Sequence, residues 1–88
     1  MKKVLIYMRP TCPYCQRAMG LLQEKGVKDI EVVNISKFPE RREEMINKAQ
    51  GRTTVPQIFI GEEELHIGGC DDMFSLDYLG KLDELLGI

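Results

Sequence analysis

The sequence predicts an α/β protein with the element order βαβαββα and a mixed four-stranded sheet with helices on both faces. Short apolar runs of strand length alternate with longer segments whose apolar residues recur at helical spacing. The first strand, the first helix and the second strand together span only residues 3–35, which suits a right-handed parallel βαβ unit. These two observations predict the fold class.

The first strand and helix are predicted at residues 3–8 and at about residues 13–25. Because the strand is nearly all apolar, we expect both of its faces to be covered. Pro13 suits the first helical position, and Gly26 suits the C-terminal stop. The apolar positions of the helix share one face and are Tyr14, Ala18, Leu21 and Leu22. Gly20 inside the helix costs about 1 kcal/mol relative to alanine, and close packing would explain it.

The remaining elements are predicted from the same periodicities and from turn residues. They are a strand at residues 31–35, a helix at about residues 39–49, a hairpin of strands at residues 57–60 and 64–67, and helical segments at about residues 71–79 and 81–86. The second helix is expected to bury a stripe formed by Met45, Ile46 and Ala49.

Composition and charge bound the class of protein. The chain of 88 residues has room for one domain, predicted to span residues 1–88, and it is 43% hydrophobic with a net charge of −2. This balance argues against disorder and against a general affinity for nucleic acid or anionic lipid. The early apolar run is too short for an export signal and is interrupted at Arg9-Pro10. We therefore expect a cytoplasmic protein, in which a lone CxxC pair is typical of catalysis or metal binding.

The sequence Cys12-Pro13-Tyr14-Cys15 follows the first strand directly and opens the first helix. Free N–H groups and the dipole at a helix start stabilise a thiolate, and Arg9 adds to this effect. Cys12 is therefore the predicted nucleophile, with a metal ligand or an inert cysteine as the alternative. Cys15 lies one turn further inward, where we expect a more buried, protonated thiol that resolves a mixed disulfide.

Two further motifs lie in the second half of the chain. Val55-Pro56 precedes a strand, and sequence alone favours a trans bond there. Gly68-Gly69 precedes a helix that begins with two aspartates. Two glycines permit close backbone approach, and the helix start offers N–H donors to a carboxylate. His66, the only histidine, falls on an edge-strand pattern and is interpreted as structural, with no role in proton transfer.

Taken together, four segments of the chain resemble the glutaredoxins. They are the CPYC sequence at Cys12, the run Thr54-Val55-Pro56, the pair Gly68-Gly69 and the acidic helix start Asp71-Asp72. The resemblance covers nearly the whole chain in order, and residues 51–60 and 66–72 look most like the small bacterial dithiol glutaredoxins of the third type. It implies a thioredoxin fold and glutathione-dependent disulfide reduction, with glutathione as a co-substrate and no permanently bound cofactor.

The resemblance also implies how glutathione is bound. Pro56 is expected to be cis, which presents the backbone of Val55 to glutathione as to a short strand. The γ-glutamyl carboxylate is expected at the amides of Cys70 to Asp72, and the Asp72 side chain is expected to receive the ammonium group. Asp71 is interpreted mainly as a helix cap. Catalysis should not depend on the Cys70 thiol, which is a candidate for oxidation or dimerisation.

Arg9 is the expected partner of the glycyl carboxylate, although many members of the family carry lysine there. Tyr14 either borders the glutathione groove or only packs on the helix, and Arg52 either adds positive potential or is only solvated. The predicted catalytic residues are Cys12 and Cys15. The predicted glutathione-binding residues are Arg9, Cys12, Tyr14, Thr54, Val55, Pro56, Gly69, Cys70, Asp71 and Asp72.

The predicted function is glutathione-dependent reduction of protein–glutathione mixed disulfides and of protein disulfides by a monomer. One alternative is a redoxin that is reduced directly by thioredoxin reductase. Another is a binding module in which two copies hold an iron–sulfur cluster through Cys12 and glutathione. A zinc site formed by Cys12, Cys15, Cys70 and His66 has suitable ligand types, but the spacing fits no compact knuckle.

Overall fold

The structure, a computed structural model, describes residues 1–88 and contains four strands and four helices. In chain order these elements are β1 (Val4–Met8), α1 (Pro13–Glu24), β2 (Ile30–Asn34), α2 (Arg41–Lys48), β3 (Gln57–Ile60), β4 (Leu65–Gly68), α3 (Cys70–Tyr78) and α4 (Lys81–Leu86). The predicted element order is confirmed, and most boundaries differ from the predictions by one or two residues. Gly80, in a left-handed conformation, separates α3 from α4.

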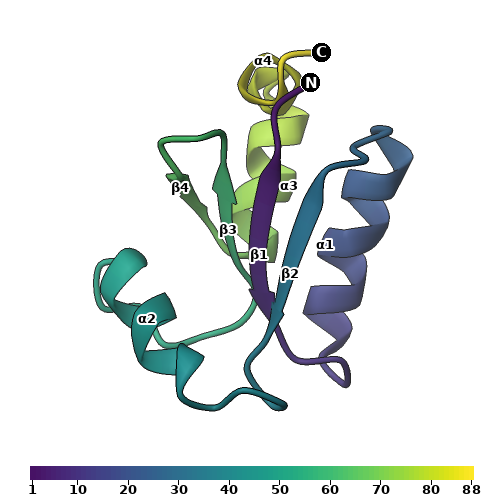
Figure 1. The fold of residues 1–88 in the computed structure, drawn as a ribbon. Coiled ribbons are helices and arrows are strands. Elements are labelled where there is room, and N and C mark those ends of the chain that lie inside the picture. The colour runs from purple at the N-terminus through teal and green to yellow at the C-terminus, as the bar shows by residue number, and fades with distance from the viewer.

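The strands form one mixed sheet in the order β2-β1-β3-β4 (Figure 1). β1 pairs in parallel with β2 and antiparallel with β3, and β3 pairs antiparallel with β4. The parallel pair and α1 form the βαβ unit that the sequence predicts. The two termini lie side by side near α4, where the Lys2 N–H donates to the Leu86 carbonyl at 2.8 Å (Figure 1).

Both faces of the sheet are covered, because successive side chains of a strand point to opposite faces. Val4 and Ile6 of β1 belong to a cluster that includes residues of α1, α3 and α4. Leu5 and Tyr7 belong to a second cluster, which includes Met45 of α2. β1 is therefore buried on both sides, and residues 9–11 connect its C-terminal end to the CPYC sequence.

Three expectations for the helices need correction. Tyr14 does not join the buried face of α1; its side chain is 54% exposed, and Cys15 is buried instead. A Cβ atom on Gly20 would meet no atom within 4 Å, so close packing does not explain this glycine. In α2, Met45 is buried as expected, whereas Ile46 is only half-buried.

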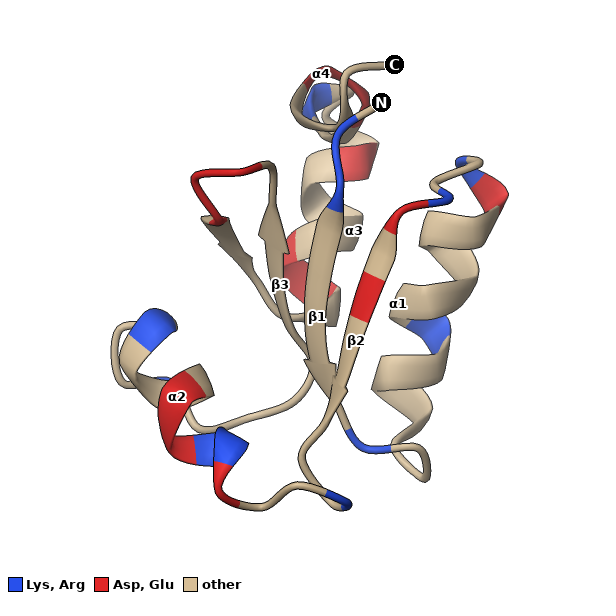
Figure 2. Ribbon diagram, in the orientation of Figure 1, with Lys and Arg blue, Asp and Glu red and all other residues tan.

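Charged residues lie mainly on the helices and loops, and β1 and β3 carry none (Figure 2). Lys25, at the end of α1, pairs with Asp77 of α3 at 2.6 Å and with Asp83 of α4 at 2.8 Å. These ion pairs connect the three helices that cover one face of the sheet. No helix is long and apolar enough to span a bilayer.

Candidate functional site

Cys12 is the N-cap residue of α1, and its thiol is half-buried at the helix start. Its Sγ atom accepts the backbone N–H of Cys15 at 3.4 Å and lies 3.9 Å from the Val55 carbonyl. Burial raises the pKa of the Cys12 thiol, but hydrogen bonds from Cys15 and Tyr14 and the charge of Arg9 lower it, and the net shift is downward. The site therefore favours a thiolate at Cys12.

Cys15 differs from Cys12 because its side chain is fully buried inside α1. Burial is the main cause that raises the pKa of the Cys15 thiol to about 12, and the neighbouring Cys12 contributes in the same direction. The expected asymmetry is present: the pair offers one thiol that ionises readily and one that stays protonated. Such a pair can begin and then complete a thiol–disulfide exchange.

The segment opposite Cys12 contains the peptide bond between Val55 and Pro56, which is cis, as the resemblance implied and against the preference of sequence alone. Neither the N–H nor the carbonyl of Val55 takes part in a backbone hydrogen bond. The N–H of Val55 is free, and its carbonyl contacts only the Cys12 thiol, so this backbone can pair with an extended ligand beside the thiol.

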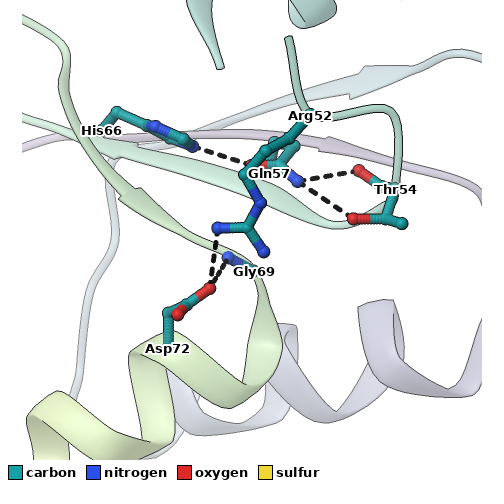
Figure 3. Close-up of polar contacts among 6 residues, drawn as sticks. All are labelled: Arg52, Thr54, Gln57, His66, Gly69 and Asp72. Atoms are coloured by element: carbon teal, nitrogen blue, oxygen red, sulfur yellow. Dashed lines mark hydrogen bonds and ion pairs between the residues drawn. The ribbon is translucent and has the colours of Figure 1, made fainter. Parts of the chain in front are cut away.

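The start of α3 is organised around Asp72. Its Oδ2 atom accepts the N–H of Gly69 at 2.8 Å and pairs with Arg52 at 2.9 Å (Figure 3). The Gly69 N–H and then Arg52 hold the pKa of Asp72 below its usual value, against the effect of burial. A Cβ atom on Gly68, at φ +106°, would lie 2.3 Å from Asp72 Oδ2. We expected Asp71 to cap this helix. Instead, the Asp72 carboxylate accepts the N–H of Gly69, the N-cap residue, and therefore caps α3.

These segments enclose a hollow of about 330 Å³. It is lined by Tyr14, Arg52, Thr54, Val55, Pro56, Gly69, Cys70, Asp71 and Asp72. The hollow brings together the start of α1, the segment before β3 and the start of α3, which are far apart in the sequence. All of the predicted glutathione-binding residues except Arg9 and Cys12 line it, and Cys12 contacts its wall at Val55.

The model of the protein family Glutaredoxin matches residues 4–66 of this chain. The chain belongs to the glutaredoxin family. Glutaredoxin 3 of Escherichia coli strain K12 is 55% identical over 86 residues, which cover 98% of this chain and 99% of that protein. The family resemblance is therefore confirmed, and the chain is a thiol–disulfide redox protein.

Solved structures confirm the thioredoxin fold of this glutaredoxin. The dithiolic glutaredoxin of Trypanosoma brucei brucei matches with a TM-score of 0.83 and 44% identity, over 97% of this chain and 87% of that one. A buckwheat glutaredoxin–glutathione complex matches with a TM-score of 0.86 and 25% identity, over 98% of this chain and 77% of that one.

Two arginines of this glutaredoxin have different surroundings near the site. Arg9 is exposed and does not line the hollow, and its charge lowers the pKa of Cys12; its contact with the glycyl carboxylate stays a prediction. Arg52 lines the hollow and pairs with Asp72 across twenty positions of the chain. No local sequence pattern predicts this ion pair, because only the tertiary fold brings Arg52 beside Asp72. Tyr14 borders the hollow and is exposed, so it does not merely pack on the helix.

Cys70 and His66 are held within the fold of this glutaredoxin, and the structure bears on the zinc hypothesis that involved both. The Cys70 side chain is only 4% exposed, and burial raises the pKa of its thiol, which disfavours the expected oxidation or dimerisation. His66 stacks on Phe59 and contacts Gln57, which agrees with its structural interpretation. No three His, Cys, Asp or Glu side chains are grouped so that they could hold a metal ion. The zinc hypothesis therefore has no geometric support.

Proposed function

We propose that this glutaredoxin uses glutathione to reduce protein–glutathione mixed disulfides and protein disulfides. The observation that carries the proposal is the thiol of Cys12, whose pKa is lowered, beside a hollow whose wall offers the free backbone N–H of Val55. The buckwheat relative that forms a complex with glutathione supports the choice of ligand. Glutathione acts as a co-substrate, and the proposed reaction needs no resident cofactor or metal.

In the proposed reaction, the Cys12 thiolate attacks the glutathionyl sulfur of a protein–glutathione mixed disulfide. The S–S bond breaks, a new S–S bond forms between Cys12 and glutathione, and the protein thiolate leaves and takes up a proton. The thiolate of a second glutathione then attacks the glutathionyl sulfur on Cys12. Glutathione disulfide leaves and the Cys12 thiolate is regenerated, so that one disulfide is reduced and one is formed.

Protein disulfides require the second thiol of the pair. Cys12 forms a mixed disulfide with the protein, and the Cys15 thiolate then attacks Cys12 Sγ and releases the reduced protein. The hydrogen bond and charge of Cys12 help to keep the pKa of Cys15 high in the reduced enzyme. These contributions disappear once Cys12 is in a disulfide, so Cys15 ionises more easily at the step that needs it. Glutathione then reduces the Cys12–Cys15 disulfide.

We propose that glutathione binds in the hollow, and the chemistry of its walls supports this. Val55 pairs with the backbone of glutathione, and the free N–H groups at the start of α3 receive the γ-glutamyl carboxylate. Asp72 receives the ammonium group. Arg9 remains the proposed partner of the glycyl carboxylate, and Arg52, which lines the hollow, is a second candidate for that contact.

The decisive experiment is glutathione-coupled reduction of a small glutathione mixed disulfide by wild type, Cys12→Ser and Cys15→Ser. We expect wild type to be active, Cys12→Ser to be inactive and Cys15→Ser to keep activity, because the monothiol cycle needs only Cys12 and glutathione. Absence of wild-type turnover with glutathione would contradict the proposal and favour a redoxin reduced by thioredoxin reductase. That alternative is tested by replacing glutathione with the reductase and its electron donor.

We further propose that the chain acts in the cytoplasm as a monomeric single domain over residues 1–88. A reduced cysteine pair of this kind is suited to a compartment that keeps thiols reduced. Sedimentation equilibrium under reducing conditions tests the oligomeric state, and a stable dimer would contradict this part of the proposal.

A further inference from the structure

A chain of hydrogen bonds connects β4 to the wall of the hollow (Figure 3). His66 Nε2 lies 2.7 Å from Gln57 Oε1. Gln57 Nε2 donates to the Thr54 carbonyl at 2.9 Å and to Thr54 Oγ1 at 3.2 Å. Apart from Tyr7 and two cysteines, Gln57 is the only buried residue with a polar side chain, and it is completely inaccessible to solvent.

The direction of these hydrogen bonds follows from their chemistry. The Thr54 carbonyl can only accept, so the amide nitrogen of Gln57 must face Thr54 and its Oε1 atom must face His66. His66 Nε2 must then carry a proton. Burial, followed by the charge of Arg52, lowers the pKa of His66, although Asp72 acts in the opposite direction. At neutral pH His66 is therefore a neutral ring with its proton on Nε2.

The His66 end of this hydrogen-bond network packs against the core. The His66 ring stacks on Phe59 with 4.9 Å between the ring centroids, and Phe59 packs edge-on against Tyr7 at 5.8 Å. Thr54, by contrast, is exposed and precedes β3, in a segment without regular secondary structure. Its backbone makes no hydrogen bond to other backbone groups. The Gln57 side chain therefore supplies both hydrogen bonds that hold Thr54 in place.

We propose that Gln57 and His66 are positioning residues that hold the Thr54–Pro56 wall in the conformation that binds the substrate. The inference rests on the proposed function, because it assigns the binding of the glutathionyl group to this wall. Thr54 and Val55 both line the hollow, and the backbone of Val55 makes no hydrogen bond to another backbone group. A binding segment whose backbone makes no hydrogen bonds to other backbone groups must be held in place by side chains, because its misplacement weakens every contact with the ligand.

Three variants test this role. His66→Phe keeps a ring that can stack on Phe59 but removes the N–H donor, and Gln57→Met keeps a side chain of similar length but removes the donors to Thr54. Thr53→Ala is the matched control, because Thr53 is exposed, lies next to Thr54 and makes no hydrogen bond. The measurements are kcat and KM for a small glutathione mixed disulfide, together with the pH profile of Cys12 alkylation.

We expect His66→Phe and Gln57→Met each to raise KM by about three- to tenfold, the scale on which the loss of one or a few neutral hydrogen bonds acts. The kcat value at saturation and the alkylation profile should stay at wild-type values, and Thr53→Ala should match wild type throughout. The double variant should resemble Gln57→Met alone, because the two residues act through one chain of hydrogen bonds. Wild-type KM values in folded single variants would overturn the inference.

A second measurement needs no variant. The protein has one histidine, so its two ring ¹⁵N resonances are assigned without ambiguity. We expect the proton on Nε2 at neutral pH; a proton on Nδ1 would overturn the inference. Absence of wild-type turnover with glutathione would overturn the proposed function and the positioning role together. Normal wild-type turnover with unchanged KM in the variants would overturn the positioning role alone.

Discussion

Cys12 and Cys15 stand three positions apart, yet the pKa of the first thiol is lowered and that of the second is raised to about 12. The two pKa values differ because the two thiols occupy different positions at the start of α1. Cys12 precedes the first turn of α1, where backbone N–H groups lack intrahelical partners and can donate to sulfur. Cys15 lies on the buried side of the same turn, where a charge is poorly solvated. The helix start thus gives two identical side chains different chemistry.

Alkylation of the reduced protein by iodoacetamide should therefore be selective. Since only the thiolate reacts, we expect Cys12 to be labelled with a midpoint below the ordinary thiol pKa of about 8.5, while Cys15 and Cys70 remain unlabelled. Arg9→Met should raise the midpoint, because the charge of Arg9 lowers the pKa of Cys12. Arg42→Met, on α2, is the control and should not move it. A wild-type midpoint at or above the ordinary value would contradict this prediction.

At the scale of elements, two glycines have opposite effects. Gly20 lies in the interior of α1, is exposed and has open space where a Cβ atom would point. Gly68 ends β4 at φ +106°, and its missing Cβ atom leaves room for Asp72 Oδ2 and for a guanidinium nitrogen of Arg52. The first glycine only weakens a helix, whereas the second lets β4 and α3 meet at the hollow.

Replacement of each glycine by alanine should separate these effects. Gly20→Ala should raise the free energy of unfolding by up to about 1 kcal/mol, since alanine is the better helix former. Gly68→Ala should lower it by more than about 1 kcal/mol, because alanine is strained at positive φ and its methyl group displaces Asp72. Urea unfolding checks both values. Equal effects of the two substitutions would show that the contact at Gly68 is not tight.

At the scale of the whole molecule, carboxylates connect elements that are distant in the sequence. Glu44 of α2 accepts hydrogen bonds from Arg41 and from the buried Tyr7 hydroxyl of β1. These two contacts, in that order, hold the pKa of Glu44 below its ordinary value, and Asp72 is shifted in the same direction by Gly69 and Arg52. Because folding lowers both pKa values, the unfolded chain binds more protons on acidification.

Stability should therefore be lost in acid. The contribution of these carboxylates is complete above the unfolded pKa of about 4 and disappears as the pH falls through the lower folded values. Thermal unfolding between neutral pH and pH 2 should show Tm falling most steeply below about pH 4. Glu44→Gln should reduce this dependence, and Glu43→Gln, at the exposed neighbouring position, should not. Identical profiles for both variants would contradict the assignment to Glu44.

The sequence by itself determined the order of strands and helices, the place of Cys12 at a helix start and the inward position of Cys15. These features depend on local periodicity and on the first turn of one helix, so neighbouring residues are enough to specify them. The motifs that line the hollow were also recognisable, because each is a short run of adjacent residues. Arg9 also stands next to the motif in sequence, but it does not line the hollow, and its contact with the glycyl carboxylate stays a prediction.

Only the tertiary structure decided which distant side chains meet. It paired Arg52 with Asp72, exposed Tyr14, and joined His66 through Gln57 to Thr54. Each of these outcomes depends on strand register and on helix rotation over the sheet; the pairing of β3 with β4, for instance, shifts register between Ile58 and Phe59. Register and rotation are settled by the packing of the whole core, and no local pattern of residues encodes them.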